Sequence, residues 1–305
     1  MCGGALFCSI TEFLNSKGQA IMITIQNGFL TASIDERGAE LTSVKSADGR
    51  EYVWQADKNF WPRHCPVLFP FCGRLLGQEY TYKGRTYSIG MHGFARDKLF
   101  TAKKQGGTSA LFTLTDDEET RAVYPFSFRF SVRFELIGDS LAITYTAENT
   151  GADTMYFNFG AHEGYALDGD FEDWSVEFEK REDLRLKEMD APGFLGRNVS
   201  DFRKNVKVLP LSYNLFERDT LIFDSLKSQS VTLQHRGRPV AEVNFAGFDN
   251  LLLWTKIGAP FLCIEPWTGL PDYVDSTKEI EKKDGILTLK KGETFSLPHT
   301  IRFFR

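Results

Sequence analysis

The stretch FSFRFSVRFEL, residues 126–136, indicates the fold class, because apolar and polar side chains alternate along its whole length. Phe, Val and Leu occupy every second position, and Ser, Arg and Glu fill the positions between them. A period of two with one apolar face predicts an antiparallel strand that is buried on one side. The segment LAITYTAE, residues 141–148, repeats this alternation after the turn IGDS. The two segments therefore predict a long β-hairpin.

Short segments of the same kind recur along the chain, separated by turn residues. A second tight hairpin is predicted at TYKGRTY, residues 81–87, with Lys83 and Gly84 at the turn. Repeated strands without intervening helices predict an all-β protein, and roughly twenty of them predict a large antiparallel β-supersandwich of two packed sheets. Besides the two hairpins, the predicted strands are residues 29–34, 40–45, 110–115, 155–160, 174–179, 230–235, 241–245, 251–255, 260–265, 286–290 and 295–304.

The chain shows no linker or low-complexity stretch between residues 22 and 305, which predicts one domain over that range. Met22 opens the segment MITIQ, which is typical of a first strand. Residues 1–21 have no basic segment ahead of an apolar one, so they do not resemble a secretory signal. We expect residues 1–21 to be a poorly ordered N-terminal extension.

Composition narrows the classes of function. The net charge of −5 and the lack of Lys/Arg clusters argue against a nucleic-acid partner. No apolar stretch approaches the roughly 18–20 residues of a membrane-spanning helix. Five cysteines without a C-x-x-C pair predict reduced thiols in a cytoplasmic protein and no zinc finger. No motif indicates a metal, a nucleotide or another cofactor.

Four short segments carry the side chains that could do chemistry. They are FPFCGRL (69–75) with Arg74, MHGFARD (91–97) with His92 and Arg96, NFGAHEGYAL (158–167) with His162, and CIEPWTGLPD (263–272) with Glu265 and Trp267. Each has a plain structural interpretation beside the functional one: a surface arginine, or a histidine with its partners in the core.

Glu265 is the least expected of these residues, since an apolar run that predicts a buried strand precedes it. Alternation puts Cys263 and Glu265 on one face of that strand, and Pro266 is expected to end the strand directly afterwards. The carboxylate would then lie at the rim of a sheet. It could be half of a buried ion pair with Arg74, or a general base with a histidine as the acid.

In their order along the chain, these four segments resemble the aldose 1-epimerase (galactose mutarotase) family, and in particular a bacterial branch associated with lactose operons. The resemblance covers about residues 22–305. It implies a β-supersandwich and metal-free interconversion of the α and β anomers of a sugar. It also implies that Glu265 is the base and His162 the acid. Arg74 and His92 would hydrogen-bond the sugar, and Trp267 would lie against it.

The family also uses an aspartate from the middle of the chain to hold sugar hydroxyls. Asp219 matches that position best, and Asp224 is the rival. One departure concerns the residue after the catalytic histidine, which is usually proline and here is Glu163. A carboxylate beside His162 is expected to favour the protonated imidazole.

The segment HGFAR also resembles the hexose-6-phosphate epimerase branch, in which the arginine matching Arg96 helps to hold the phosphate. Arg63 and Arg85 are further candidates for that role. Three functions therefore remain open: an aldose 1-epimerase acting on a free hexose, a hexose-6-phosphate 1-epimerase, and a carbohydrate-binding protein without turnover. In each case the partner is a small sugar, and the protein is expected to be a monomer or a homodimer.

Overall fold

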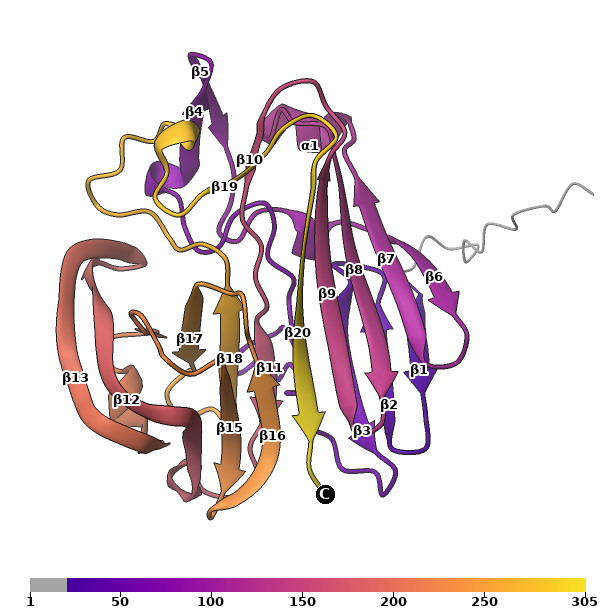
Figure 1. The fold of residues 1–305 in the computed structure, drawn as a ribbon, viewed down its shortest axis with the longest axis vertical. Coiled ribbons are helices and arrows are strands. Elements are labelled where there is room, and N and C mark those ends of the chain that lie inside the picture. The colour runs from indigo at the N-terminus through magenta and orange to yellow at the C-terminus, as the bar shows by residue number, and fades with distance from the viewer. Residues whose placement is uncertain (1–20) are drawn as a thin grey trace, which may run out of the picture.

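The computed structural model describes residues 21–305, and strands dominate it (Figure 1). The predicted extension, residues 1–21, lies outside the described residues apart from Ile21. The all-β prediction is confirmed, since the only α-helix of the described chain is the six-residue α1 (Glu118–Val123). Five short 3-10 helices accompany it: Leu76–Gln78, Ala95–Asp97, Phe171–Asp173, Tyr213–Phe216 and Ile280–Lys282.

A nine-stranded antiparallel sheet forms the larger layer. Its predicted central hairpin is confirmed, and residues Phe130, Val132 and Phe134 all point into the core. The strands, in spatial order, are β13 (Phe194–Pro210), β12 (Trp174–Ala191), β15 (Ser230–His235), β16 (Arg238–Asn244), β20 (Thr294–Phe303), β9 (Ser140–Asn149), β8 (Phe128–Ile137), β7 (Ser109–Thr115) and β6 (Thr101–Gln105).

Smaller sheets pack against this layer. A three-stranded sheet lies behind β7, β8 and β9 in Figure 1, and its Ile25 and Ile34 share one hydrophobic core with Phe130. Its strands are β1 (Met22–Gln26), β2 (Leu30–Asp35) and β3 (Glu40–Ser46). There are also two two-stranded sheets. One is the predicted hairpin of β4 (Glu79–Tyr82) and β5 (Arg85–Ser88), and the other pairs β10 (Met155–Phe157) with β19 (Leu287–Leu289).

A four-stranded antiparallel sheet carries the candidate site. Its strands, in order, are β11 (Glu163–Ala166), β18 (Phe261–Trp267), β17 (Asn250–Trp254) and β14 (Leu221–Ile222). Leu262 and Ile264 of β18 join the main core, whereas Phe261 and Cys263 pack into a separate cluster with Trp54. The expected alternation along this segment is confirmed, and it directs Glu265 away from the main core.

The prediction that Pro266 ends this strand is wrong. Pro266 lies inside β18, where it pairs with Leu251 of β17, and Trp267 continues the ladder by pairing with Asn250. Proline lacks an N–H, but its carbonyl still accepts a hydrogen bond, here from the Ala161 N–H at 3.0 Å. Glu265 is therefore held between two paired residues rather than at the end of its strand.

The second difference is the length of β12 and β13. The sequence predicted a strand only at 174–179, because the charged residues that follow show no sustained alternation. In the structure both strands run on as a curved hairpin with several register shifts, and the hairpin lies beside β17 in Figure 1. Register shifts of this kind bend a strand.

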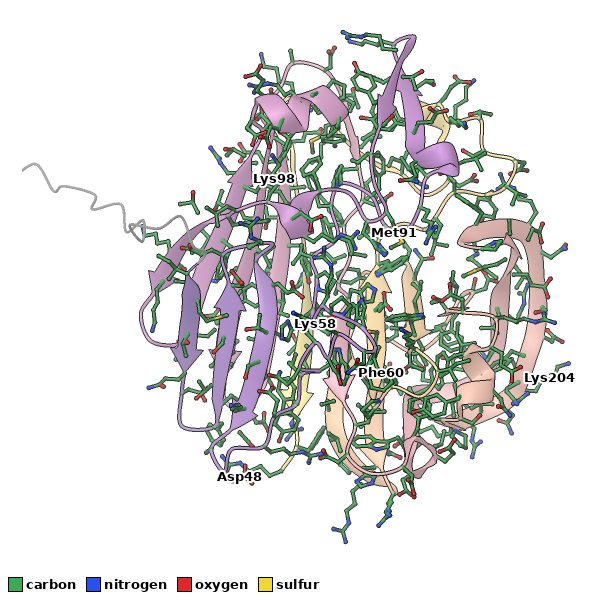
Figure 2. The ribbon with its side chains drawn as sticks, turned by 180° about the vertical axis from the view of Figure 1, so that it is seen from behind. Asp48, Lys58, Phe60, Met91, Lys98 and Lys204 are labelled. Atoms are coloured by element: carbon green, nitrogen blue, oxygen red, sulfur yellow. The ribbon has the colours of Figure 1, made fainter. Side chains whose placement is uncertain are left out.

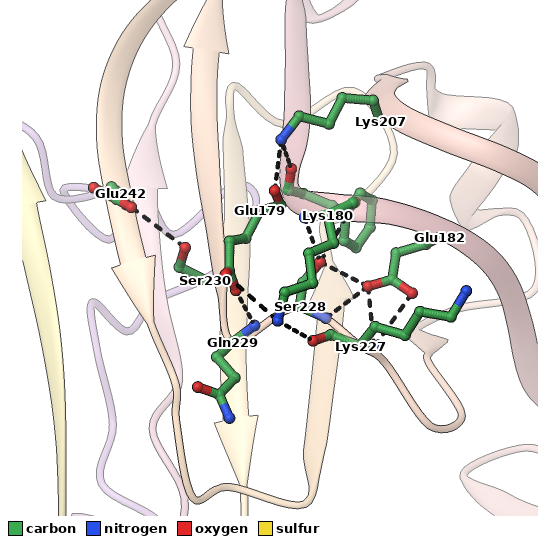
Figure 3. Close-up of polar contacts among 10 residues, drawn as sticks. Glu179, Lys180, Glu182, Lys207, Lys227, Ser228, Gln229, Ser230 and Glu242 are labelled. Carbon is green, nitrogen blue, oxygen red and sulfur yellow. Dashed lines mark hydrogen bonds and ion pairs between the residues drawn. The ribbon is translucent and has the colours of Figure 1, made fainter.

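A buried carboxylate fixes the bend of this hairpin. Glu182 of β12 is 2% exposed and accepts hydrogen bonds from the backbone N–H and hydroxyl of Ser228 at 2.7 and 2.6 Å (Figure 3). It also accepts from the Lys227 N–H at 3.0 Å. Since donors surround it, this glutamate has a structural role.

Two simpler observations concern the described residues as a whole. Cys65, Cys72 and Cys263, the three cysteines within 21–305, are all buried and unpaired. No helix in this range combines the length and the apolar character needed to span a membrane.

Candidate active site

A cavity of about 270 Å³ opens where the four-stranded sheet meets the loops before β4 and after β5. Figure 2 shows Met91, one of its lining residues, near the centre of the molecule. The seven residues preferred for the site all line this cavity, whereas the rival candidates Asp224, Arg63 and Arg85 do not. The seven are Arg74, His92, Arg96, His162, Asp219, Glu265 and Trp267. Their individual roles stay predictions.

Isolated backbone bridges bring the four sequence segments together. Leu68 pairs with Gly160, and Gly160 pairs in turn with Trp267. Phe69 pairs with Gly93, which has a positive φ of 72° and lies so close that a Cβ atom there would be 2.2 Å from the Phe69 carbonyl oxygen. Only glycine fits that approach. Segments up to 200 residues apart in the chain thus converge on one cavity.

His162 and Glu265 face each other across two neighbouring strands. Glu163 of β11 pairs with Ile264 of β18, so the adjacent residues His162 and Glu265 project from the opposite face of the sheet. The Nε2 of His162 lies 3.3 Å from the Oε2 of Glu265, and the two residues are 8% and 1% exposed. The partner of Glu265 is thus His162 and not Arg74, the alternative that the sequence left open.

Burial favours the neutral form of both groups. It lowers the pKa of His162 to about 3. It also raises the pKa of the Glu265 carboxyl well above its usual range, with the charges of Glu163 and Asp219 adding to the effect. Both shifts favour a neutral imidazole beside a carboxyl group that carries its proton. Moving that proton to the histidine creates an acid and a base next to each other.

His92 is oriented by the backbone. The ring Nδ1 of His92 accepts a hydrogen bond from the backbone N–H of Gly73 at 3.1 Å, and the backbone N–H of His92 donates to the Gly73 carbonyl at 2.8 Å. Burial, followed by the charges of His162 and Arg96, keeps the pKa of His92 well below its ordinary value. The ring is therefore neutral with its proton on Nε2, which makes Nε2 a hydrogen-bond donor for a ligand.

The structure separates the two candidate aspartates. Asp219 follows the 3-10 helix Tyr213–Phe216 with a positive φ of 80° and lines the cavity. Asp224 is bound instead by Lys187, whose Nζ lies 2.8 Å from its Oδ1. The position of Asp219 agrees with the preferred assignment.

The arginines differ in how they meet the cavity. Arg96 lines it with a largely buried side chain, and its Nε has no hydrogen-bond partner among the described residues. Burial and the nearby charge of Arg63 both lower the pKa of Arg96. Arg63 itself is paired with Asp97 at 2.7 Å. Arg85 lies on the β4–β5 hairpin over the ring of Tyr87, and it does not line the cavity.

Two tryptophans that the sequence analysis missed flank the catalytic candidate His162. Trp61 stacks on its ring with a centroid distance of 4.9 Å, and Trp254 meets it edge-on at 5.8 Å. On the other side, the Nε1 of Trp267 donates to the Ala161 carbonyl at 2.9 Å. The segments NFWPR and LLLWT contain aromatics, but nothing in their spacing connects them with His162.

The tip of the β12–β13 hairpin forms one wall of the cavity through Met189, Pro192 and Gly193. A Cβ atom on Gly193 would lie 2.9 Å from the Cδ of Arg74, so the tip rests directly on that side chain. Backbone hydrogen bonds between Leu195 and the segment 272–274 hold the tip in place. This wall was also missed, because the hairpin was not predicted to extend so far.

The expectation about Glu163 is wrong. Consecutive residues of a strand point to opposite faces, so Glu163 turns away from the cavity and into the core. There its Oε1 lies 3.3 Å from the Nε2 of His299, with both side chains buried. His162 is not held protonated, since burial lowers its pKa.

We expect Glu163→Ala to lower the free energy of unfolding by about 1–3 kcal/mol, because it leaves the buried imidazole of His299 without the carboxyl group that lies 3.3 Å from it. Urea unfolding followed by Trp fluorescence measures the change. The double variant Glu163→Met/His299→Leu is the control and should lose much less, since an apolar pair leaves no buried polar group unpaired. Equal losses in both variants would show that packing, not the polar pair, stabilises this region.

A set of potential metal ligands joins two lining residues of the cavity, His162 and Glu265, to the buried Cys263. One ligand atom each from His162, Cys263 and Glu265 lies within 4.8 Å of the other two, and all three residues are buried. The sequence analysis did not find this set, because it looked for cysteine pairs and not for residues brought together across strands.

Comparisons with known proteins agree with this architecture. A family model described as aldose 1-epimerase matches residues 22–302. The chromosomal protein LacX of Lactococcus lactis subsp. lactis is 34% identical over 276 residues, which is 86% of this chain and 92% of LacX. An Escherichia coli K12 protein whose name proposes glucose-6-phosphate 1-epimerase activity is 28% identical over 153 residues, 46% of this chain and 49% of that protein.

The solved structure of a galactose mutarotase related enzyme from Lactobacillus acidophilus superimposes with a TM-score of 0.88 at 34% identity. The match covers 93% of this chain and 98% of that one. The fold, the order of the four segments and the family match agree over almost the whole length described here. The chain belongs to the aldose 1-epimerase family.

Proposed function

We propose that the protein is an aldose 1-epimerase that interconverts the α and β anomers of a free hexose. The observation that carries the proposal is the approach of His162 Nε2 to Glu265 Oε2, 3.3 Å apart on the floor of one cavity. Ring opening requires a base for the proton of the C1 hydroxyl and an acid for the ring oxygen. Because both oxygens are bonded to C1, the acid and the base must lie a few ångströms apart.

In the proposed reaction the carboxyl proton of Glu265 first moves to His162. The Glu265 carboxylate then takes the proton of the C1 hydroxyl while the His162 imidazolium protonates the ring oxygen. The C1–ring oxygen bond breaks, which leaves an aldehyde and a new hydroxyl. Rotation about the C1–C2 bond turns the other face of the aldehyde toward that hydroxyl. Closure then runs in reverse, with His162 as the base and Glu265 as the acid, so each group ends in its starting state.

The other lining residues fit the recognition of a sugar. His92 offers a donor at Nε2, and Asp219 and Arg74 offer charged hydrogen-bonding groups at the opening. The lining side chains Trp61, Trp254 and Trp267 supply apolar surface for the C–H groups of a sugar ring. A few polar groups on an apolar wall are typical of a small-molecule site.

Magnetisation-transfer NMR tests this proposal directly. Anomer exchange is measured with glucose, galactose and glucose-6-phosphate in parallel, and Trp fluorescence reports binding in the same samples. Faster exchange on a free sugar supports the proposal. Binding without faster exchange on any of the three would favour a carbohydrate-binding protein that has lost turnover.

A phosphosugar is the second candidate substrate, favoured by the buried Nε of Arg96, which has no hydrogen-bond partner among the described residues and lies 3.8 Å from the Asp97 carboxylate. We expect Arg96→Ala to reduce kcat/KM for glucose-6-phosphate at least about tenfold more than for glucose, since arginine binds phosphate by a charged two-pronged contact. Arg85→Ala, away from the cavity, is the control. Equal losses on both substrates would mean that Arg96 has a structural role.

A further inference from the structure

The strongest unexplained feature beside the cavity is the thiol of Cys263, which is fully buried next to the lining residues His162 and Glu265. It lies two residues before Glu265 on the same face of β18, and it pairs across the sheet with Gly164, which has no side chain. His162 stands diagonally opposite. The acid–base reaction described above gives this thiol no part, although its sulfur lies within 4.8 Å of ligand atoms of both His162 and Glu265.

We propose that His162, Cys263 and Glu265 form a binding site for a zinc ion, and that zinc bound there excludes the sugar. The inference rests on the proposed function only for its inhibitory consequence. The binding itself depends on the three side chains and the space between them.

The ligand types favour zinc over other divalent cations. An imidazole nitrogen, a thiolate and a carboxylate are the ligands that protein zinc sites use, and three protein ligands leave a fourth position open for water. Magnesium and calcium prefer oxygen ligands throughout, and in larger number. The ligand types and their number therefore favour zinc over magnesium and calcium.

The spacing is close to what zinc needs. Tetrahedral zinc with bonds of about 2.0–2.3 Å holds its ligand atoms about 3.3–3.8 Å apart. The histidine nitrogen and the glutamate oxygen are already 3.3 Å apart. The sulfur lies within 4.8 Å of both ligand atoms and has to approach by about 1 Å, which a turn of about 30° about χ1 of Cys263 supplies. Zinc takes the thiolate, and the thiol proton leaves to the solvent.

Occupation of this site blocks the reaction for a simple reason. The metal uses the two groups that would exchange protons with the sugar, and its open coordination position faces the cavity that the sugar would fill. A bound sugar and a bound zinc ion therefore exclude each other. Each should weaken the other's binding by the same factor.

The test counts zinc ions on the full-length protein by competition with a chromophoric zinc indicator, without sugar. Cys2 and Cys8 are replaced by serine in every sample, because these two thiols lie outside the described residues and could bind zinc themselves. We expect one tightly bound zinc ion per chain. Cys263→Ser should weaken that binding at least about tenfold, because a hydroxyl is a much poorer zinc ligand than a thiolate.

Cys65→Ser is the matched control, since Cys65 is also buried but packs in the main core. It should keep the zinc affinity. Circular dichroism and the melting temperature show whether each variant is folded, and Cys263→Ala provides a second test if the serine variant is not. Equal zinc affinity in the Cys263 variants and the control overturns the site.

A second measurement separates this inference from the proposed function. Zinc at ten times its dissociation constant should slow anomer exchange about tenfold, and a chelator should restore it. Zinc binding without any exchange on the tested sugars would overturn the proposed function and leave the metal site standing. Tight zinc binding that saturating substrate does not weaken would overturn the exclusion of sugar by zinc.

Discussion

Glu265→Gln is expected to lower kcat for anomer exchange by about 10²–10⁴-fold, the usual contribution of a positioned general base. Glutamine has nearly the same shape, so it keeps the packing of β18 but cannot accept the proton of the C1 hydroxyl. Glu265 is 1% exposed, and burial raises the pKa of its carboxyl and so favours the neutral form; a neutral amide there costs little stability. Magnetisation-transfer NMR on the preferred sugar measures the change.

Glu182→Gln is the matched control for this variant, because Glu182 is also a buried glutamate but lies at the bend of β12, where backbone and hydroxyl donors surround it. It should lose stability and keep its exchange rate per folded molecule. A Glu265→Gln protein with a rate near that of the wild type would remove Glu265 from the chemistry.

His162→Asn is expected to cause a loss of similar size, about 10²–10⁴-fold in kcat. Asparagine has no group that can donate and take back a proton near neutral pH, so the ring oxygen would leave without an acid. The sugar should still bind, since the flanking surfaces of Trp61 and Trp254 remain. The measurement is therefore kcat from exchange, together with a fluorescence titration for the dissociation constant.

His235→Asn is the control for this change, since His235 stacks on Trp174 in the nine-stranded sheet, away from the cavity. The double variant His162→Asn/Glu265→Gln adds a sharper test. If the two groups act as one proton-exchanging pair, the double variant loses about as much as either single one. Losses that multiply would mean that the two groups act independently.

The sequence predicted the parts of this protein in which local pattern and tertiary structure agree. The strict alternation in 126–136 predicted β8 and its hairpin, and the Lys83-Gly84 turn predicted the β4–β5 pair. The seven candidate residues, chosen from four segments and a family resemblance, all line one cavity. Their convergence could not be derived from the residues themselves, because it depends on bridges between segments far apart in the chain.

Other features of the fold could not be predicted from the hydrophobic pattern of the sequence. The outer halves of β12 and β13 are charged on both faces, so no period marks them as strands. Pro266 was expected to end its strand because it has no N–H to donate. At its position in the sheet only its carbonyl forms a hydrogen bond, with the Ala161 N–H, so the missing N–H does not interrupt the strand. The direction of Glu163, by contrast, was predictable. Two consecutive strand residues point to opposite faces, so a carboxylate directly after a cavity-facing His162 belongs in the core.

The candidate acid–base residues and the outer wall of the cavity belong to different strands, which has a consequence for protein engineering. His162 and Glu265 are positioned by the pairing of β11 with β18, whereas Met189, Pro192 and Gly193 belong to the tip of a separate hairpin. Libraries confined to residues 189–193 should therefore change which sugars are accepted while leaving the distance between acid and base untouched. For the same reason, substitutions that accumulate at the tip of the β12–β13 hairpin during evolution can change substrate preference without moving His162 or Glu265.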